Sequence, residues 1–307
     1  MKTLSVIVPI YNEGTAFSSF LNNLYREVSK LGLKFEILVL DSVTKDNSKD
    51  VVIEFSKKHK EVKGYFLRHP GVAVTDKTNK YMLGFELAQG DYVVTMDGDG
   101  QDRPEEMFKF IEKLEDGYDF VIGYKQKRKD GRLYILTSKV ANGLMRWVTG
   151  VKVHDMNNGY KAFRKEILGD LKLRSGHFRF LPVIASAKKW KTDEVRVLHK
   201  PRESGRGKFS FISRLQGGLF DMVIVFIVSK MGDTPMYLLG WTALAIFLFS
   251  VILLGIALFT EATLVGVFSA LFFGLSMQLL LIGVIIEYIR GEQTTKSYRN
   301  LIVSETN

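Results

Sequence analysis

The sequence predicts an α/β domain with a mostly parallel sheet, followed by an amphipathic juxtamembrane helix and a two-helix transmembrane hairpin. Residues 1–210 alternate short apolar runs with longer mixed segments, which is the pattern of strands and covering helices in α/β domains. Between Thr234 and Ile286 the only charged side chain is Glu261. It divides this stretch into two apolar segments, and each is long enough to cross a bilayer at roughly 20 residues a span.

Five apolar runs are expected to form the strands of the sheet: residues 4–10, 35–40, 63–68, 91–96 and 119–123. The stretches between them have the mixed composition of helices that cover a sheet: residues 15–32, 46–59, 78–89 and 104–116. A helix between two strands lets the second strand run parallel to the first. Ligands of such sheets collect at the carboxyl ends of the strands, so a site is expected there.

The chain after residue 210 is expected to meet a membrane. Residues 211–232 repeat apolar side chains at helical spacing, which fits a helix packed on the soluble domain or a helix lying on the cytoplasmic leaflet. We favour the second because a hairpin is predicted at 233–289, with spans at 236–259 and 262–286. Two buried core helices are the alternative, but a soluble chain of this size rarely hides two such segments.

Basic side chains lie on both sides of the predicted hairpin. They are Lys200, Arg202, Arg206, Lys208, Arg214 and Lys230 before it, and Arg290, Lys296 and Arg299 after it. The positive-inside rule then places both flanks in the cytoplasm. We therefore expect a protein of the cytoplasmic membrane with two spans, both termini inside, and a cytoplasmic tail at residues 290–307.

The chain is basic, with a formal net charge of +10 at pH 7 and a sequence pI near 9.5. Such an excess favours anionic partners: nucleic acid, phosphorylated substrates or an anionic membrane face. Nucleic acid is not expected, because no recognition motif appears and the positive residues flank the hairpin. The absence of cysteine excludes disulfides and thiolate chemistry. The apolar run before Pro9 is too short for a signal peptide.

Carboxylates crowd the stretch "VVTMDGDGQDRPEEM", residues 93–107. Asp97 and Asp99 follow an apolar run, and the glycines beside them allow a tight turn that aims both carboxylates at one point. Two such carboxylates repel each other unless a cation lies between them, and oxygen ligands favour Mg²⁺ or Mn²⁺. The alternative is a solvated acidic turn. We prefer that alternative for Asp102 and Glu105, which open the next helix.

Five motifs in this order, followed by two apolar spans, resemble the polyprenyl-phosphate glycosyltransferases of glycosyltransferase family 2. The motifs are "SVIVPIYNEG", Asp-Gly-Asp after a strand, "HDMNNGYKAFR", "FRFLPVIA" and "VRVLHKPRESGRGKFS". Bactoprenol glucosyltransferases belong to this group, and dolichol-phosphate mannose synthases are similar. The resemblance covers nearly the whole chain and implies a GT-A fold. It also implies transfer of a sugar from a nucleotide sugar to a membrane-embedded polyprenyl phosphate, with inversion.

The resemblance also implies roles for individual residues. It places Asp97, Asp99 and Gln101 around the metal ion, and Asp155 near the reacting centre. The positions that match nucleotide-sugar-binding residues of the family are Pro9, Tyr11, Asn12, Glu13, Asp41, Lys77, Arg202 and Lys208. For the basic stretch 200–208, binding of anionic lipid is an alternative role. His154 is expected to be structural.

Basic residues between Lys125 and Arg132 follow the predicted strand 119–123. This loop should lie on the active-site side of the sheet, where the lipid phosphate must arrive. Arginine can hold a phosphate with two parallel hydrogen bonds, so Arg128 and Arg132 are the expected acceptor-phosphate ligands. A solvated charged loop is the alternative for most of the lysines.

The sequence departs from the family pattern at several places. Leu40 and Asp41 stand where two adjacent aspartates are usual, Gly100 is an extra glycine in the acidic loop, and residues 68–84 form a longer connection. The segment "SGHFRFLP" lacks the expected glutamate and histidine before Arg179. These departures bear on the donor. The expected order is UDP-glucose, then UDP-N-acetylglucosamine, then GDP-mannose.

Two other classes of function are compared with this one. A processive polysaccharide synthase shares the fold, but "AKKW" at 187–190 is a poor match to its Gln-x-x-Arg-Trp signature. A non-catalytic membrane scaffold with a decayed site would explain the departure at Leu40, but it would not explain the intact Asp97 and Asp99. Association of several copies into a homo-oligomer is left open by the resemblance.

Overall fold

The computed structural model describes residues 2–14, 16–42, 44–68, 73–126, 143, 153–156, 158–171, 178, 181–198, 235–293 and 298–306. The chain divides into two compact units. The first contains Met1–Val225 together with Tyr298–Asn307, and the second contains Phe226–Ser297.

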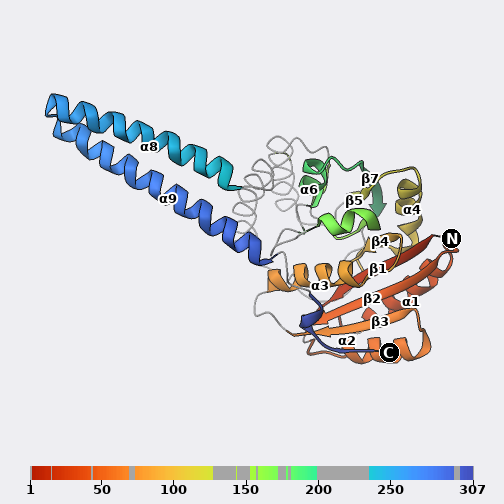
Figure 1. The fold of residues 1–307 in the computed structure, drawn as a ribbon. Helices are drawn as coiled ribbons and strands as arrows, with labels where there is room; N and C mark the ends of the chain where they lie inside the picture. Colours follow the sequence, from red (N-terminus) through yellow and green to blue (C-terminus); the bar gives the residue numbers. More distant parts are fainter. Residues whose placement is uncertain are drawn as a thin grey trace. The chain divides into compact units, whose positions relative to one another are not determined.

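The first unit is built on an 8-stranded sheet with the strand order β7-β5-β6-β4-β1-β2-β3-β8 (Figure 1). The strands are β1 (Thr3–Ile10), β2 (Lys34–Ser42), β3 (Val62–Leu67), β4 (Tyr92–Thr95), β5 (Phe120–Gln126), β6 (Lys161–Arg164), β7 (Thr192–Leu198) and β8 (Ile302–Glu305). Strand β1 pairs in parallel with β2 and β4, and β2 with β3. The predicted α/β fold with a mostly parallel sheet is confirmed, and all five predicted strands are present.

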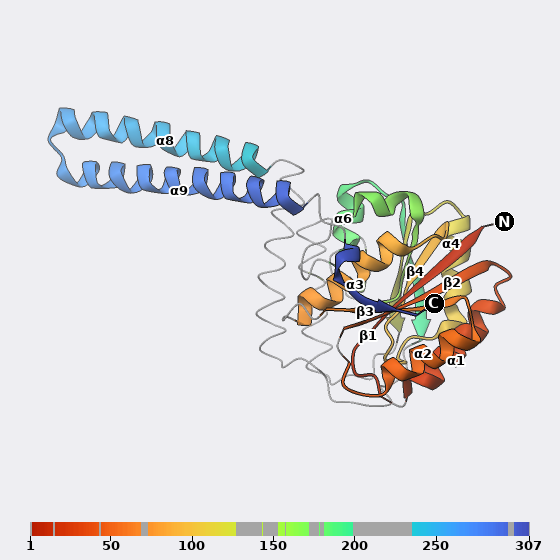
Figure 2. The same ribbon diagram turned by 60° about the horizontal axis from the view of Figure 1, so that its bottom comes forward.

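Helices cover both faces of this sheet (Figure 2). They are α1 (Ala16–Ser29), α2 (Ser48–Lys58), α3 (Ala73–Leu87), α4 (Met107–Glu115) and α6 (Leu181–Ala187), with the 3₁₀ turns η1 (Pro104–Glu106) and η2 (Lys165–Asp170). Side chains of α1, α2 and α4 form one core cluster, and those of α3, η2 and α6 form the other. On β1, Val6 belongs to the first cluster and Ile7 to the second. Burial on both faces explains why this strand is a continuous apolar run.

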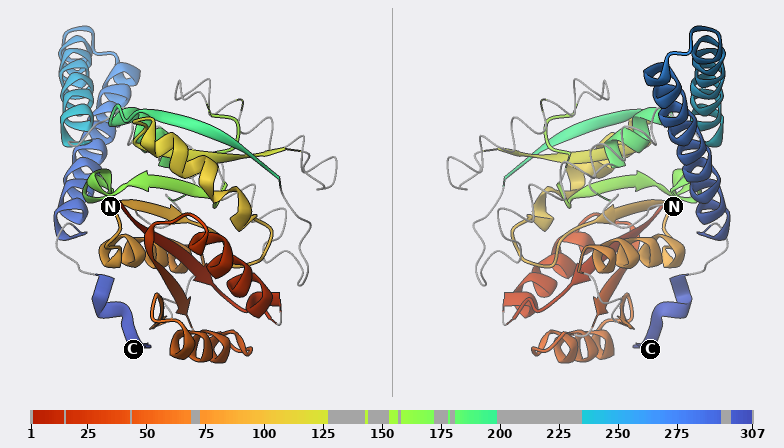
Figure 3. Two further views of the ribbon diagram at one scale, coloured as in Figure 1. Left: turned by 90° about the vertical axis from the view of Figure 1, so that its right-hand side faces the viewer. Right: turned by 90° about the vertical axis from the view of Figure 1, so that its left-hand side faces the viewer.

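Two strands are antiparallel to their neighbours and were not predicted. Strand β6 runs antiparallel to β4 and β5, so it brings the sequence around residue 160 next to the end of β4. Strand β8 follows the second apolar segment in the sequence and pairs antiparallel with β3 at the edge of the sheet. In Figure 3 the C-terminus, which follows β8, is marked near the orange helix α2. The predicted cytoplasmic tail, 290–307, therefore contributes its last part to the sheet of the first unit.

Several contacts attach the C-terminal segment to the sheet. The turn η4 (Tyr298–Leu301) precedes β8, and the Tyr298 N–H donates to Glu86 Oε2 at 2.8 Å. Thr306 is bonded twice to Gly64: its N–H donates to the Gly64 carbonyl at 2.9 Å, and its Oγ1 accepts from the Gly64 N–H at 2.8 Å. The C-terminal residues are thus part of the folded domain.

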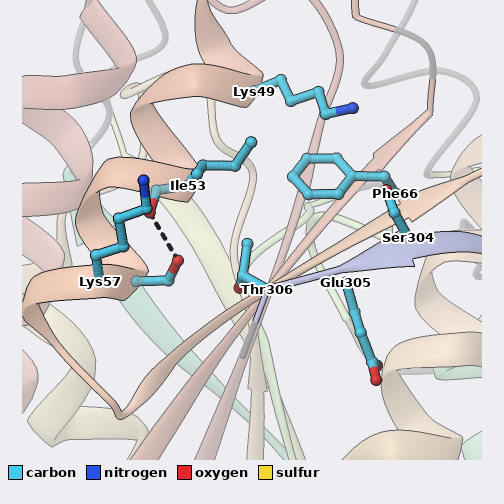
Figure 4. A pocket seen from close by; sticks show the side chains of 8 residues that line it. Lys49, Ile53, Lys57, Phe66, Ser304, Glu305 and Thr306 are labelled. Atoms are coloured by element: carbon cyan, nitrogen blue, oxygen red, sulfur yellow. Dashed lines mark hydrogen bonds between the residues drawn. The ribbon is translucent and has the colours of Figure 1, made fainter.

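A groove of about 350 Å³ lies between α2 and β8 (Figure 4). Its lining residues are Lys49, Ile53, Ser56, Lys57, Phe66, Ser304, Glu305 and Thr306. The Lys49 ammonium lies 4.6 Å from the centre of the Phe66 ring. None of these residues is a predicted site residue, so the candidate site is elsewhere.

The second unit is a hairpin of two long helices, α8 (Pro235–Thr260) and α9 (Thr263–Gln293), packed side by side (Figure 1). The segments Leu239–Thr260 and Thr263–Ile286 are long and apolar enough to cross a membrane. Within an apolar 18-residue stretch of each segment, only 11% and 17% of the residues are buried. Helices from the core of a soluble protein would be mostly buried. These exposed apolar helices therefore match the predicted membrane hairpin.

Small side chains bring the two helices of the hairpin together. The Ser269 hydroxyl donates across the interface to the Ser250 carbonyl at 2.8 Å, and both serines are buried. A Cβ on Gly283 would lie 3.0 Å from Met236 Sδ and 3.3 Å from Leu239 Cβ, so this glycine allows α8 to approach α9 closely. Close approach through small residues and hydroxyl bonds is typical of helix packing in membranes. The predicted helix at 211–232 lies outside the described residues.

Candidate active site

The candidate site lies at the carboxyl ends of β1, β2 and β4. These strands are parallel neighbours, so the residues that follow each of them meet at one edge of the sheet. Tyr11, Asn12 and Glu13 follow β1, Asp41 lies near the end of β2, and Asp97 follows β4. The structure thus brings together the nucleotide residues predicted on the first two loops and the predicted metal loop.

The loops after β1 and β2 are joined by hydrogen bonds. The Lys45 N–H donates to Asn12 Oδ1 at 2.7 Å, and the Gly14 N–H donates to Asp46 Oδ2 at 2.7 Å. Asn12 has a φ of +52°, a left-handed conformation that asparagine tolerates better than most residues. These bonds hold the two loops as one preformed surface.

Asp41 is buried beneath this surface. Burial raises the pKa of its carboxyl above the ordinary value, although the hydrogen bond from the Thr44 hydroxyl and the nearby Lys80 charge act in the opposite direction. Lys80 is also buried, and its ammonium donates to the Ile10 carbonyl at 2.7 Å. A buried carboxyl with raised pKa is typical of a binding site.

The loop after β4 carries the paired carboxylates. Gly100 has a φ of +73°, which favours glycine, and the Gln101 N–H donates to Asp99 Oδ1 at 3.2 Å. A Cβ on Gly98 would lie 2.7 Å from Ile10 Cγ2, so this glycine lets the loop pack against the end of β1. The extra glycine therefore forms the turn that the acidic loop requires.

Two side chains of α3 bind the Asp97 carboxylate. The Lys77 ammonium lies 2.9 Å from Oδ1 and 3.1 Å from Oδ2, and the Tyr81 hydroxyl donates to Oδ1 at 2.9 Å. Burial alone would raise the pKa of Asp97, but Lys77, together with the Lys125 charge and the Tyr81 hydrogen bond, holds this pKa well below the ordinary value. Asp97 is therefore ionised and already receives one cation.

Residues 158–161, which lead into β6, approach Asp97. A Cβ on Gly159 would lie 2.5 Å from Asp97 Oδ2, so only glycine leaves room for this carboxylate. The Thr95 hydroxyl donates to the Gly159 carbonyl at 2.8 Å. Asn158 donates from Nδ2 to the Gly123 carbonyl at 2.6 Å, which fixes the same segment to β5.

Two further lysines face the acidic group. Lys125, on β5, lies 3.8 Å from Asp102 Oδ1. Burial would lower its pKa, but the charges of Asp102, Asp97, Asp155 and Asp99 raise it above the ordinary value. Asp155 is buried and also acts on Lys161. The predicted reacting-centre aspartate therefore lies within electrostatic reach of the lysines that face the metal loop.

Lys161 is fully buried beside these residues. Its ammonium donates to the Asn158 carbonyl and lies 4.1 Å from the centre of the Phe178 ring. The Phe178 ring stacks on Tyr81, with centroids 3.5 Å apart. Burial, with repulsion by Lys77, lowers the pKa of Lys161 to about 7. Tyr81, which donates to Asp97, is thus held in place by its stack on Phe178, and Phe178 in turn contacts the Lys161 ammonium.

His154 is attached to β7 rather than to the acidic loop. Its Nδ1 lies 2.6 Å from Glu194 Oε2, and its backbone N–H donates to Glu194 Oε1 at 2.5 Å. Its ring packs on Tyr124 at a centroid distance of 4.9 Å. These contacts favour the structural role expected for this histidine.

The carboxylates of the acidic loop are the oxygen ligands available to a divalent ion. Within the described residues, no group of three or more His, Cys, Asp and Glu side chains is arranged to hold a metal. Asp97 and Asp99 nevertheless supply carboxylate oxygens in one loop, and Asp97 already binds a cationic group. Such a pair fits an ion that takes its remaining ligands from a substrate and water, as Mg²⁺ commonly does.

Four predicted ligands lie outside the described residues. They are the acceptor candidates Arg128 and Arg132 and the diphosphate candidates Arg202 and Lys208. Conversely, the structure adds Tyr81, Lys125, Gly159 and Lys161 to the site. The quoted motif "HDMNNGYKAFR" contained two of these, but its sequence gave no sign that β6 would pair with β4.

Comparisons with known proteins agree with the motifs. Residues 5–172 match the model of Glycosyl transferase family 2. The chain is 30% identical over 300 residues to an undecaprenyl-phosphate 4-deoxy-4-formamido-L-arabinose transferase of Pectobacterium atrosepticum, covering 94% of this chain and 88% of the relative. The protein of that name from Pseudomonas aeruginosa strain LESB58 is 32% identical over 300 residues, with coverages of 93% and 84%.

The fold agrees with a solved glycosyltransferase structure. Glucosyl-3-phosphoglycerate synthase from Mycobacterium tuberculosis superposes with a TM-score of 0.55 at 18% identity, covering 74% of this chain and 80% of that chain. One structure of that enzyme contains Mn²⁺, uridine diphosphate and glucosyl-3-phosphoglycerate. The likeness confirms the expected GT-A fold. By the family match and by its relatives over nearly the full length, the chain belongs to glycosyltransferase family 2.

Proposed function

We propose that this chain transfers a sugar from a nucleotide sugar to a polyprenyl phosphate at the cytoplasmic face of a membrane, with inversion and with a divalent ion. The observation that carries the proposal is the meeting of the Asp97 loop with the loops after β1 and β2 at one edge of the sheet. The relatives named as undecaprenyl-phosphate transferases support the lipid acceptor.

The donor nucleotide is assigned to the loops after β1 and β2. The support is the preformed surface of Tyr11, Asn12 and Glu13 against the loop that follows buried Asp41. The donor diphosphate then lies towards Asp97 and Asp99. A divalent ion held by these two aspartates, with Gln101 in the same loop, would supply positive charge to the leaving diphosphate. Lys77, Arg202 and Lys208 are proposed to add positive charge there.

The acceptor phosphate needs positioning more than deprotonation. A phosphate monoester has a second pKa near 6 by analogy with phosphorylated side chains, so much of it is a dianion at neutral pH. The main demand on the protein is to hold this anion against the donor diphosphate in spite of their repulsion. We assign this work to Arg128 and Arg132, and we assign orientation of the acceptor or of a basic side chain to Asp155.

The hairpin α8–α9 is proposed to hold the catalytic domain at the membrane, where the acceptor resides. Its exposed apolar surface supports an anchor, because such a surface would be unfavourable in water. The basic flanks of the hairpin favour cytoplasmic placement of both termini.

The identity of the transferred sugar is proposed from the names of the relatives. The relatives are named for 4-deoxy-4-formamido-L-arabinose, a pentose derivative, whereas UDP-glucose was the donor expected from the motifs. We therefore place a UDP-activated 4-deoxy-4-formamido-L-arabinose first and UDP-glucose second, with UDP-N-acetylglucosamine and GDP-mannose after them.

A donor screen tests this proposal. Purified full-length protein is mixed with undecaprenyl phosphate, Mg²⁺ or Mn²⁺, and each of the four radiolabelled nucleotide sugars in turn. Radioactivity that partitions into the organic phase with one donor, and disappears with a chelator, is the expected result. No lipid-linked sugar from any donor, with protein that still binds uridine diphosphate, would contradict transfer to this acceptor.

A further inference from the structure

Asp97 is a proposed metal ligand, and the Lys77 ammonium already binds the carboxylate oxygens that a metal ion would need. The ammonium contacts both oxygens of the carboxylate, at 2.9 Å and 3.1 Å. Tyr81 takes a further lone pair of Oδ1. A divalent ion bound to Asp97 would therefore meet a cation already seated on the same oxygens, and the two would repel each other.

Three lysines surround the acidic loop, and they differ in their freedom to move. Lys161 is 0% exposed and donates to the Asn158 carbonyl. The Lys125 side chain is 17% exposed, lies near the end of β5 and faces the buried Asp102. The Lys77 side chain is 47% exposed and lies on α3. Lys77 alone among these three can leave its carboxylate for solvent or for an incoming ligand without opening the core.

We propose that the Lys77 ammonium binds Asp97 in the free protein and is displaced when a divalent ion binds. The free protein therefore binds the ion weakly. The ion binds tightly only together with the donor diphosphate. The inference rests on the proposed function for the identity of the diphosphate. The displaced ammonium is then available to the diphosphate oxygens, which are its strongest nearby partners. Ion and diphosphate each favour the release of Lys77, so each strengthens the binding of the other.

Tyr81 keeps Asp97 in place during this exchange. Its hydroxyl bonds to Asp97, and its ring stacks on Phe178, which lies against the Lys161 ammonium. The Lys77 ammonium also lies 5.8 Å from the centre of the Tyr81 ring, but the hydrogen bond to Asp97 and the stack on Phe178 are made by Tyr81 itself. The carboxylate can therefore change cations without changing its position.

Titration with Mn²⁺ tests the exchange on the full-length protein in detergent. Free Mn²⁺ is measured by electron paramagnetic resonance, with and without uridine diphosphate. In the wild type we expect uridine diphosphate to raise Mn²⁺ affinity about 10-fold or more. Lys77→Met should bind Mn²⁺ about 10-fold more tightly than the wild type without nucleotide, and the nucleotide should then add less.

Three variants control the result. Lys77→Arg keeps a cation on Asp97 and should bind Mn²⁺ as weakly as the wild type. Lys113→Met removes an equal charge from an ion pair with Asp193 on another face, and it should leave Mn²⁺ affinity unchanged. The double variant Lys77→Met/Asp97→Asn should lose the added affinity, which places the gain at Asp97. Damage to the fold would lower affinity and so cannot mimic a gain.

Mn²⁺ affinity of Lys77→Met equal to or weaker than that of the wild type, without nucleotide, would overturn the exchange. That outcome, with sugar transfer intact in the wild type, leaves the proposed function standing. The two proposals can also fail the other way round. Tighter Mn²⁺ binding by Lys77→Met, with no sugar transfer to undecaprenyl phosphate by the wild type, would support the exchange and contradict the proposed acceptor.

Discussion

The Asp97 carboxylate receives Lys77 and Tyr81 from one helix and packs against Gly159, which precedes β6. The pairing of Asp97 with Asp99 could be predicted from the sequence, because both carboxylates lie in one short loop after an apolar run. Gly159 and Lys161 could not be placed, because their proximity to Asp97 depends on the pairing of β6 with β4. The spacing of residues along the chain can identify ligands within one loop. The residues that surround those ligands depend on the order of the strands in the sheet, which the spacing does not show.

Asp99→Asn should leave the protein folded and membrane-bound but lower turnover by about 100-fold or more, since one charged ligand of the proposed ion is replaced by a neutral amide. Sugar transfer at saturating donor, measured over a range of Mn²⁺ concentrations, checks this. Retention of most of the divalent-dependent turnover would remove Asp99 from the metal site.

Gly159→Ala should lower turnover by about 100-fold, because the new methyl group would lie 2.5 Å from Asp97 Oδ2 and must displace that carboxylate. Gly169→Ala is the matched control, since nothing lies within 4 Å of its Cβ position. Steady-state kinetics of both variants provide the comparison. Equal turnover in the two would show that the close approach has no catalytic consequence.

At the scale of elements, five strands follow from their apolar runs, whereas β6, β7 and β8 were not predicted. Strands β6 and β8 have 4 residues each and β7 has 7, and all three mix charged or polar side chains with apolar ones instead of forming an apolar run. Strand β8 also follows a long apolar helix, where a solvated tail was the simpler expectation. Its place is decided by the free edge of β3, which offers backbone groups that need partners.

Thr306→Val should destabilise the first unit by about 1–2 kcal/mol, because the Gly64 N–H loses the hydroxyl oxygen that accepts its hydrogen bond. Val303→Thr, at a side chain that is 67% exposed, should change stability little. Urea-dependent proteolysis of the full-length variants measures both. A smaller loss for Thr306→Val than for Val303→Thr would mean that the C-terminal segment does not hold the sheet edge.

At the scale of the whole molecule, the hairpin and the catalytic unit are linked twice, because the chain enters the hairpin from one part of the first unit and returns to supply β8. Truncation of the chain near residue 232 would thus remove a strand along with the hairpin. A cleaner variant replaces residues 235–293 with a flexible linker and keeps residues 298–307.

This linker variant should bind uridine diphosphate as the full protein does but use long-chain polyprenyl phosphate poorly. The described nucleotide residues all precede the hairpin, while the proposed anchor that keeps the site near the acceptor is gone. Donor-binding calorimetry and turnover with long-chain acceptor in vesicles separate the two effects. Equal turnover of the long-chain acceptor by both proteins would count against an anchoring role.

The paired aspartates that follow β4 are proposed to serve sugar transfer to a lipid phosphate. This role is tested most directly with full-length protein in vesicles that contain undecaprenyl phosphate, by counting labelled sugar in the lipid phase with wild type, Asp99→Asn and chelator-treated protein. We expect lipid-linked sugar from the wild type alone, restored in the treated sample by Mg²⁺ or Mn²⁺. Lipid-linked sugar at equal rates in all three samples would contradict it.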